Sequence, residues 1–92
     1  MLADVQFVLN ATKLYRRPTL PIFVAQGPMN CQEHLRIVLS ETILALKAAG
    51  ANAIFLDLCG PPNDGCGGHP GQLGHAGMAE QAIPVISKAM GW

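Results

Sequence analysis

Two short apolar runs, LPIFVA at Leu20–Ala25 and AIFLDL at Ala53–Leu58, decide the fold of this chain of 92 residues. Runs of this length without polar alternation are typical of strands that are buried on both faces of a sheet. The residues between the two runs have helical spacing, so the order strand, helix, strand predicts a parallel βαβ unit. The sequence therefore predicts an α/β fold.

A helix is expected on each side of this unit. Residues 3–16 carry apolar side chains at helical spacing, and Pro18 ends that segment because proline disfavours the helical conformation in the preceding residue. The helical pattern returns from about Gln72, and Pro84 is expected to kink this last helix because it removes one backbone hydrogen bond. The expected inner face of the last helix comprises Met78, Ala79, Ala82, Ile83, Ile86 and Met90.

The helix between the strands has sequence signals at both ends. Asn30 is expected to be its N-cap, with Glu33 three residues later as in a capping box. Gly50 is placed for the C-terminal cap, since glycine readily adopts the left-handed conformation found there. The expected inner face of this helix comprises Leu35, Val38, Leu39, Thr42, Ile43 and Leu46.

Together these elements predict a partial three-layer α/β sandwich with at least one unpaired strand edge. Charged residues make up 13% of the chain, against about 25% in typical domains, and the net charge is zero. A small domain has much surface to cover, so this low content indicates that missing sequence or a partner covers part of it. We expect self-association, or an N-terminal complement, at the exposed strand edge.

The composition argues against several classes of partner. Lys13, Arg16 and Arg17 form the only basic cluster, which is too short for the broad footprint that nucleic acid requires. The apolar runs are far shorter than a membrane span, and no basic segment leads into an apolar one at the start, so neither a membrane partner nor a signal peptide is expected. No sequence feature calls for a cofactor.

A glycine- and proline-rich segment, CGPPNDGCGGHPG at residues 59–71, follows the second strand and is predicted to be an irregular loop. In open α/β sheets, ligands bind beyond the carboxyl ends of the strands, which is where this loop lies. It carries Asp64, Cys66 and His69. A histidine in such a loop can act as a general base with a pKa near neutrality.

The segment GCGGHPGQLGHAGMAEQAIPVISKAMGW, residues 65–92, resembles the last block of SGNH (GDSL-type) hydrolases. It is most similar to carbohydrate esterases of the second family, which remove acetyl groups from glycans and have a Gly-Cys, His-Pro and Met-Ala pattern. PIFVAQGPM at residues 21–29 and AIFLDL at residues 53–58 resemble the last two strands of those enzymes. The resemblance implies the C-terminal half of a flavodoxin-like domain over residues 1–92.

The resemblance also implies roles for individual residues. His69 matches the general base that takes the proton from the catalytic serine. Many SGNH enzymes have an aspartate three residues before this histidine, where this chain has Cys66. Either Asp64 orients His69 from the loop, or a backbone carbonyl does so.

The family's nucleophile belongs to a Gly-Asp-Ser block, which this chain lacks. Ser40 and Ser87 are its only serines, and both are expected inside helices, where Ser40 bonds the preceding turn or water. Without a nucleophile and an oxyanion hole, a histidine alone gives little acceleration. We therefore expect the chain alone to lack significant esterase activity.

Cysteine and histidine residues near the loop leave two structural alternatives. Cys59, Cys66, His69 and His75 have zinc-ligand chemistry, but the spacing of the two cysteines does not fit a zinc knuckle, and no metal site is predicted. If the parent protein is secreted, a disulfide between Cys59 and Cys66 is the favoured alternative. Cys31 is expected to be a buried helix residue, and His75 to pack or cap at the start of the last helix.

Two functions remain open. The first is the C-terminal segment of an SGNH-type serine esterase, which supplies His69 for the deacetylation of a carbohydrate or the hydrolysis of another small ester. The second is a non-catalytic α/β module that acts in binding or association.

Overall fold

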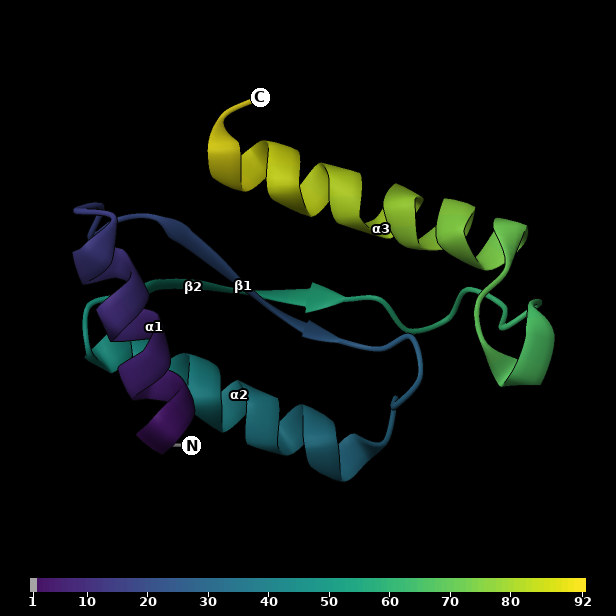
Figure 1. Cartoon of the computed structure of the whole chain (residues 1–92), viewed down its shortest axis with the longest axis horizontal. Helices are drawn as coiled ribbons and strands as arrows, with labels where there is room; N and C mark the ends of the chain where they lie inside the picture. Colours follow the sequence, from purple (N-terminus) through teal and green to yellow (C-terminus); the bar gives the residue numbers. More distant parts are fainter. Residues whose placement is uncertain (1) are drawn as a thin grey trace.

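The computed structural model describes residues 2–92 and shows a mixed α/β chain with a two-stranded sheet (Figure 1). Its elements in order are α1 (Leu2–Leu14), β1 (Pro21–Gln26), α2 (Glu33–Ala48), β2 (Asn52–Asp57) and α3 (Gln72–Met90), with a 3-10 turn at Cys66–Gly68. Both predicted strands and the three predicted helices are confirmed. No helix within residues 2–92 is long and apolar enough to cross a membrane.

The strands β1 and β2 pair in parallel, as predicted. Pro21 lies opposite Asn52, and Gln26 lies opposite Asp57. The Leu58 N–H donates to the Gln26 carbonyl at 2.9 Å, which continues the ladder one residue beyond β2. The carboxyl ends of both strands therefore lie side by side at one end of the sheet, where the following loops meet.

The helices lie on the two faces of this sheet, with α2 and α1 on one face and α3 on the other (Figure 1). Side chains alternate between faces along each strand. Val24 and Phe55 pack against the small core on the α2 side, whose most buried large side chain is Leu46 at 1% exposure. Leu56 points to the opposite face and is buried at 7% exposure.

The start of α2 differs from the prediction. The helix begins at Glu33, with Gln32 as its N-cap, so the predicted cap at Asn30 and its capping box are wrong. The Asn30 Oδ1 atom accepts a bond from the Gln32 N–H at 3.3 Å, which makes a turn ahead of the helix. At the other end, Gly50 has a φ of 92° directly after the last turn, as the predicted cap requires.

The chain has an unusually large surface. Its accessible area is 6178 Å², whereas about 5,100 Å² is typical of a folded monomer of this mass. Its radius of gyration is 14.5 Å, against about 12 Å for a compact domain of this length. The exposed side chains include Val38 and Ile83, which were predicted to face the core.

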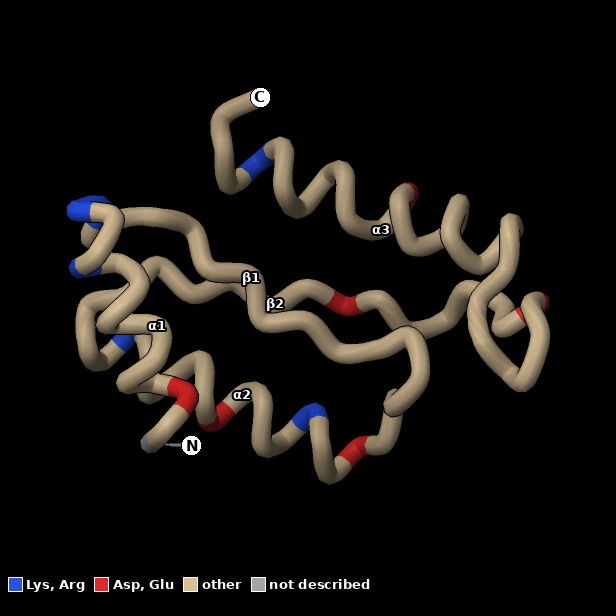
Figure 2. Tube along the Cα trace, in the orientation of Figure 1, with Lys and Arg blue, Asp and Glu red and all other residues tan. Residues whose placement is uncertain are grey.

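Charged residues are sparse along the whole trace (Figure 2). Large apolar side chains are exposed on every helix, including Phe7, Leu14, Leu44 and Leu73, and Trp92 is exposed beyond the end of α3. Helices α1, α2 and α3 therefore each retain an apolar surface that no described part of the chain covers.

Candidate functional site

The loop between β2 and α3 is held against the first turn of α3 by Asp64. The Asp64 Oδ1 atom accepts bonds from the N–H groups of Gly71 at 2.8 Å and Gly74 at 2.9 Å, and Oδ2 accepts one from Leu73 at 3.1 Å. These bonds satisfy backbone donors that a helix start leaves free. The bonds from Gly71 and Gly74, with that from Leu73, hold the pKa of the Asp64 carboxyl below its ordinary value of 3.8.

Two glycines allow this close packing. A Cβ at Gly74 would meet the Pro62 carbonyl and the Pro70 ring, and Gly74 is buried. A Cβ at Gly77, one turn further along α3, would lie 2.8 Å from the Pro61 Cβ. The proline-rich half of the loop therefore lies directly on the amino-terminal half of α3.

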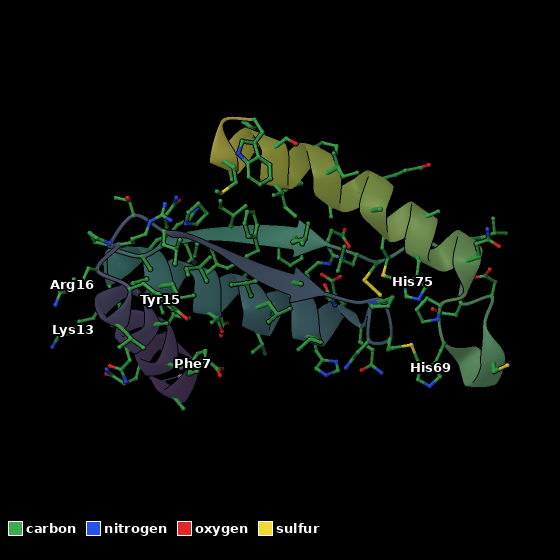
Figure 3. The ribbon with its side chains drawn as sticks, turned by 45° about the horizontal axis from the view of Figure 1, so that its top comes forward. Phe7, Lys13, Tyr15, Arg16, His69 and His75 are labelled. Atoms are coloured by element: carbon green, nitrogen blue, oxygen red, sulfur yellow. A yellow bond between two sulfur atoms is a disulfide. The ribbon has the colours of Figure 1, made fainter. Side chains whose placement is uncertain are left out.

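The backbone of His69 is fixed within the loop, whereas its side chain is exposed. The His69 N–H donates to the Cys66 carbonyl at 3.2 Å, and the His69 carbonyl accepts from the Gly65 N–H at 2.8 Å. Gly67 and Gly68 both have positive φ, which permits the tight turn between these bonds. The His69 side chain, labelled in Figure 3, projects from the loop next to the 3-10 turn and is exposed.

No hydrogen bond to the His69 ring occurs among residues 2–92, and the Asp64 carboxylate bonds α3 instead. The role of Asp64 as the orienting acid stays a prediction, and the same holds for the general-base role of His69. His75 lies in the first turn of α3, where its N–H donates to the Gly71 carbonyl at 2.9 Å, and its side chain is exposed. Sequence reasoning missed the capping bonds of Asp64, which the spacing of an acidic residue ahead of an uncapped helix could have suggested.

The disulfide of this chain joins Cys31 to Cys59, so the predicted pairing of Cys59 with Cys66 is wrong. Cys31 is exposed in the segment before α2, which also corrects its prediction as a buried helix residue. The two cysteines follow adjacent parallel strands, whose carboxyl ends bring the loops together, and their Cα atoms lie 5.9 Å apart. Cys66 is a free, exposed thiol.

The disulfide also removes Cys59 from the set of zinc-ligand side chains around the loop. Within residues 2–92, no three histidine, cysteine or acidic side chains are placed to hold a metal ion.

A polar cluster that sequence reasoning missed fixes the start of the loop. The Asp57 carboxylate accepts a bond from the Cys59 N–H at 2.9 Å and pairs with the Arg36 guanidinium at 3.3 Å. The hydrogen bond from the Cys59 N–H lowers the pKa of Asp57 most, and the Arg36 guanidinium lowers this pKa further through its hydrogen bond and its charge. Arg36 also stacks over the Phe55 ring at 5.3 Å, and the Gln81 side chain donates to the Cys59 carbonyl at 2.8 Å.

Neither serine is placed beside His69. The Ser40 hydroxyl donates to the Arg36 carbonyl at 2.8 Å within α2, as predicted. Ser87 lies 15 positions after Gln72, the first residue of α3, which corresponds to about 22 Å along the helix and away from the loop. The described residues therefore provide a candidate base without a serine nucleophile next to it.

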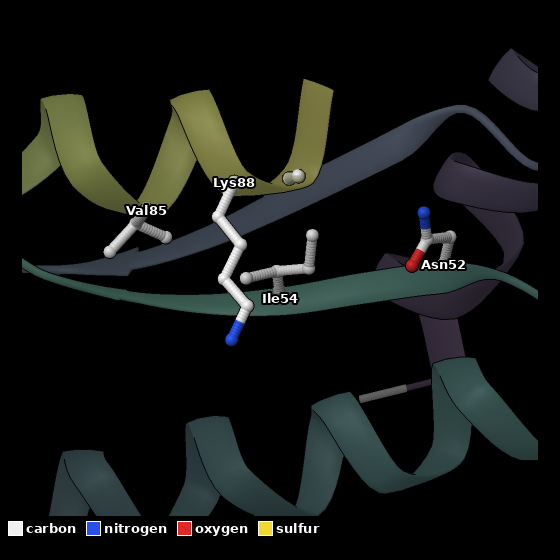
Figure 4. A pocket seen from close by; sticks show the side chains of 5 residues that line it. Asn52, Ile54, Val85 and Lys88 are labelled. Atoms are coloured by element: carbon white, nitrogen blue, oxygen red, sulfur yellow. The ribbon is translucent and has the colours of Figure 1, made fainter. Parts of the chain in front are cut away.

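Two hollows lie elsewhere on the molecule. A groove of about 500 Å³ between β2 and α3 is lined by Asn52, Ile54, Val85, Lys88 and Ala89 (Figure 4). Because Asn52 begins β2, this groove is at the amino ends of the strands, opposite to the His69 loop. A second hollow of about 300 Å³ on α1 is lined by Phe7, Asn10, Ala11, Leu14 and Tyr15.

Comparison with known proteins gives no further assignment, since no family model, no curated protein and no solved structure matches the chain.

Proposed function

We propose that this chain is the C-terminal segment of an SGNH-type serine esterase, in which His69 is the general base for carboxylic-ester hydrolysis. The substrate class is an acetylated carbohydrate or another small ester. The proposed architecture is the C-terminal half of a flavodoxin-like three-layer sandwich. The single observation that carries the proposal is the His69 loop, which presents an exposed imidazole from a fixed backbone beyond the carboxyl end of β2.

The physical reason is that a general base needs a defined position and access to a partner. Hydrogen bonds on both sides of His69, together with the Asp64 bonds to α3, hold the loop backbone in place. The ring itself has no intramolecular partner among residues 2–92, so it is free to accept a proton from a hydroxyl that approaches the loop. That hydroxyl must come from outside this chain, because Ser40 and Ser87 lie elsewhere.

The test is a chimaera in which residues 20–92 replace the corresponding C-terminal part of an SGNH acetyl esterase that retains its own Gly-Asp-Ser block. We expect acetyl release from acetylated xylan, and we expect His69→Ala to lower turnover by at least about 100-fold, as for loss of a general base. His75→Ala is the matched control and should change turnover less than about twofold. A folded, inactive chimaera, or one that is insensitive to His69→Ala, would refute the proposal.

The second candidate is a non-catalytic module for binding or association. The observation that favours it is the open apolar surface, with side chains such as Leu44 and Leu73 each 67% exposed. Under this alternative the chimaera would be inactive and the isolated chain would be a stable, soluble assembly.

A further inference from the structure

The outer edge of β1 is one of the two unpaired edges of the sheet among the described residues. The hydrogen bond from the Leu58 N–H to the Gln26 carbonyl shows which alternate residues of β1 face β2. These are Ile22, Val24 and Gln26, whose backbone N–H and C=O groups point toward β2. The direction of the backbone hydrogen-bonding groups alternates along a strand, so the N–H and C=O groups of Phe23 and Ala25 point to the open edge. In Figure 1 the helices lie above and below β1, and none passes over the strand.

Beyond Pro21, this edge lacks the features by which monomeric proteins prevent pairing. Edge strands are usually short, charged, bulged or covered. The six residues of β1, PIFVAQ, contain no charged side chain, and proline occurs only at the first position. By contrast, β2 carries Asp57 and is the strand that α3 contacts most.

The sheet face next to this edge is also open on the α3 side. Phe23 and Ala25 share that face with Ile54 and Leu56, as the register requires. Leu56 is buried at 7% exposure, whereas Ala25 is exposed and Phe23 is half-buried. The helix α3 thus covers the β2 half of this face and leaves the β1 half without cover.

We propose that a second copy of this chain occupies the edge, with the two β1 strands paired antiparallel about a two-fold axis in a four-stranded sheet. The surface excess of about 1,000 Å² per chain is close to the roughly 800 Å² per partner that a standard interface buries. Pairing of two β1 strands brings no like charges together, because β1 has no charged side chain and the chain has no net charge. An isologous contact of this kind closes after two copies. The inference does not depend on the proposed function.

The first measurement is the solution mass of the unmodified chain and of Cys66→Ser, which excludes linkage through the free thiol. Sedimentation velocity should give twice the chain mass of 9.7 kDa for both. Hydrogen exchange should show protected amides at Phe23 and Ala25. A species of 9.7 kDa at all concentrations would leave the edge to a different polypeptide and overturn the proposal, as would larger, open-ended assemblies.

The second measurement uses charge at the edge. Ala25→Lys and Ala25→Glu should each weaken the dimer by about 100-fold, since like charges in an interface cost several kcal/mol. Mixing the two variants should restore a species of dimer mass. Leu44→Lys on the exposed face of α2 is the matched control and should leave the dimer unchanged. Dimers that persist in Ala25→Lys, with fast exchange of the amides at positions 23 and 25, would overturn the geometry even if the variants were less stable.

Discussion

Removal of the Cys31–Cys59 disulfide should destabilise the chain strongly. The change is the double substitution Cys31→Ser with Cys59→Ser, made in a Cys66→Ser background so that no thiol remains. The bridge spans a sequence separation of 28 residues. In the chain-entropy treatment, a closed loop of that length corresponds to about 3.6 kcal/mol at 25 °C.

This magnitude is large for a chain of this size. A domain of 92 residues typically has a free energy of unfolding of about 5–14 kcal/mol. The loop that the bridge closes contains all of α2 and the crossover between β1 and β2. Without the bridge, the segment that carries most of the core residues is unconstrained in the unfolded chain. The disulfide therefore supplies between about a quarter and about three quarters of the expected stability.

The assay is urea unfolding followed by circular dichroism at one fixed protein concentration. With an m-value of about 1–1.5 kcal/mol/M, the midpoint should fall by about 2.4–3.6 M relative to Cys66→Ser alone. Cys66→Ser itself should unfold with the midpoint of the unmodified chain, because its thiol is exposed and unbonded. A midpoint of the double variant within about 0.5 M of the control would refute the reasoning.

Three further predictions concern the core, the loop and the thiols. Leu46→Ala should cost about 2–5 kcal/mol in urea unfolding because Leu46 is 1% exposed, whereas Leu44→Ala, at 67% exposed, should stay within about 0.5 kcal/mol. Asp64 has a lowered pKa in the fold, so its contribution is complete above the ordinary value of 3.8 and is lost as the pH falls through the lowered pKa. The melting temperature should therefore drop on acidification below pH 3.8, and this drop should be smaller in Asp64→Asn; an unchanged pH profile would show that the carboxylate does not cap α3. Thiol titration should find one reactive thiol in the native chain, at Cys66, and two more after denaturation with reductant; three native thiols would contradict the bridge.

The strands and helices were predictable because their signals are local. Continuous apolar runs marked β1 and β2, and the 3.6-residue period marked the helices. The cap at Asn30 was wrong because a turn and a disulfide, which depend on tertiary contacts, decide where α2 begins. The Cys31–Cys59 bridge was missed for the same reason, although both cysteines follow strands that were correctly predicted to be parallel neighbours. Parallel strands place their following loops side by side, so a pairing between loops was the better inference from the predicted topology.

In the candidate site, His69 could be predicted from the sequence, whereas the contacts of Asp64 could not. His69 could be named from the loop and its resemblance, and the fold places it on a fixed backbone with an exposed ring. Asp64 could be named as a carboxylate of the loop, but its three bonds to the start of α3 arise only when loop and helix pack together. A residue near a histidine in sequence is therefore a weaker candidate for its orienting partner than an unbonded carboxylate near it in space.

The open edge of β1 connects the two proposals. An antiparallel β1 pair directs the carboxyl ends of the two strands in opposite directions, so the His69 loops of the two copies lie at opposite ends of the shared sheet. The partner copy then brings neither Ser40 nor Ser87 to His69, since these serines lie within α2 and at the far end of α3. A self-paired chain should consequently be inactive as an esterase. A separate segment that carries a serine on a strand next to β1 would have to displace the second copy. When such a segment is mixed with this chain, acetyl release should therefore fall if self-pairing is strengthened. It should rise with Ala25→Lys, provided that the variant is folded to the same extent as the unmodified chain.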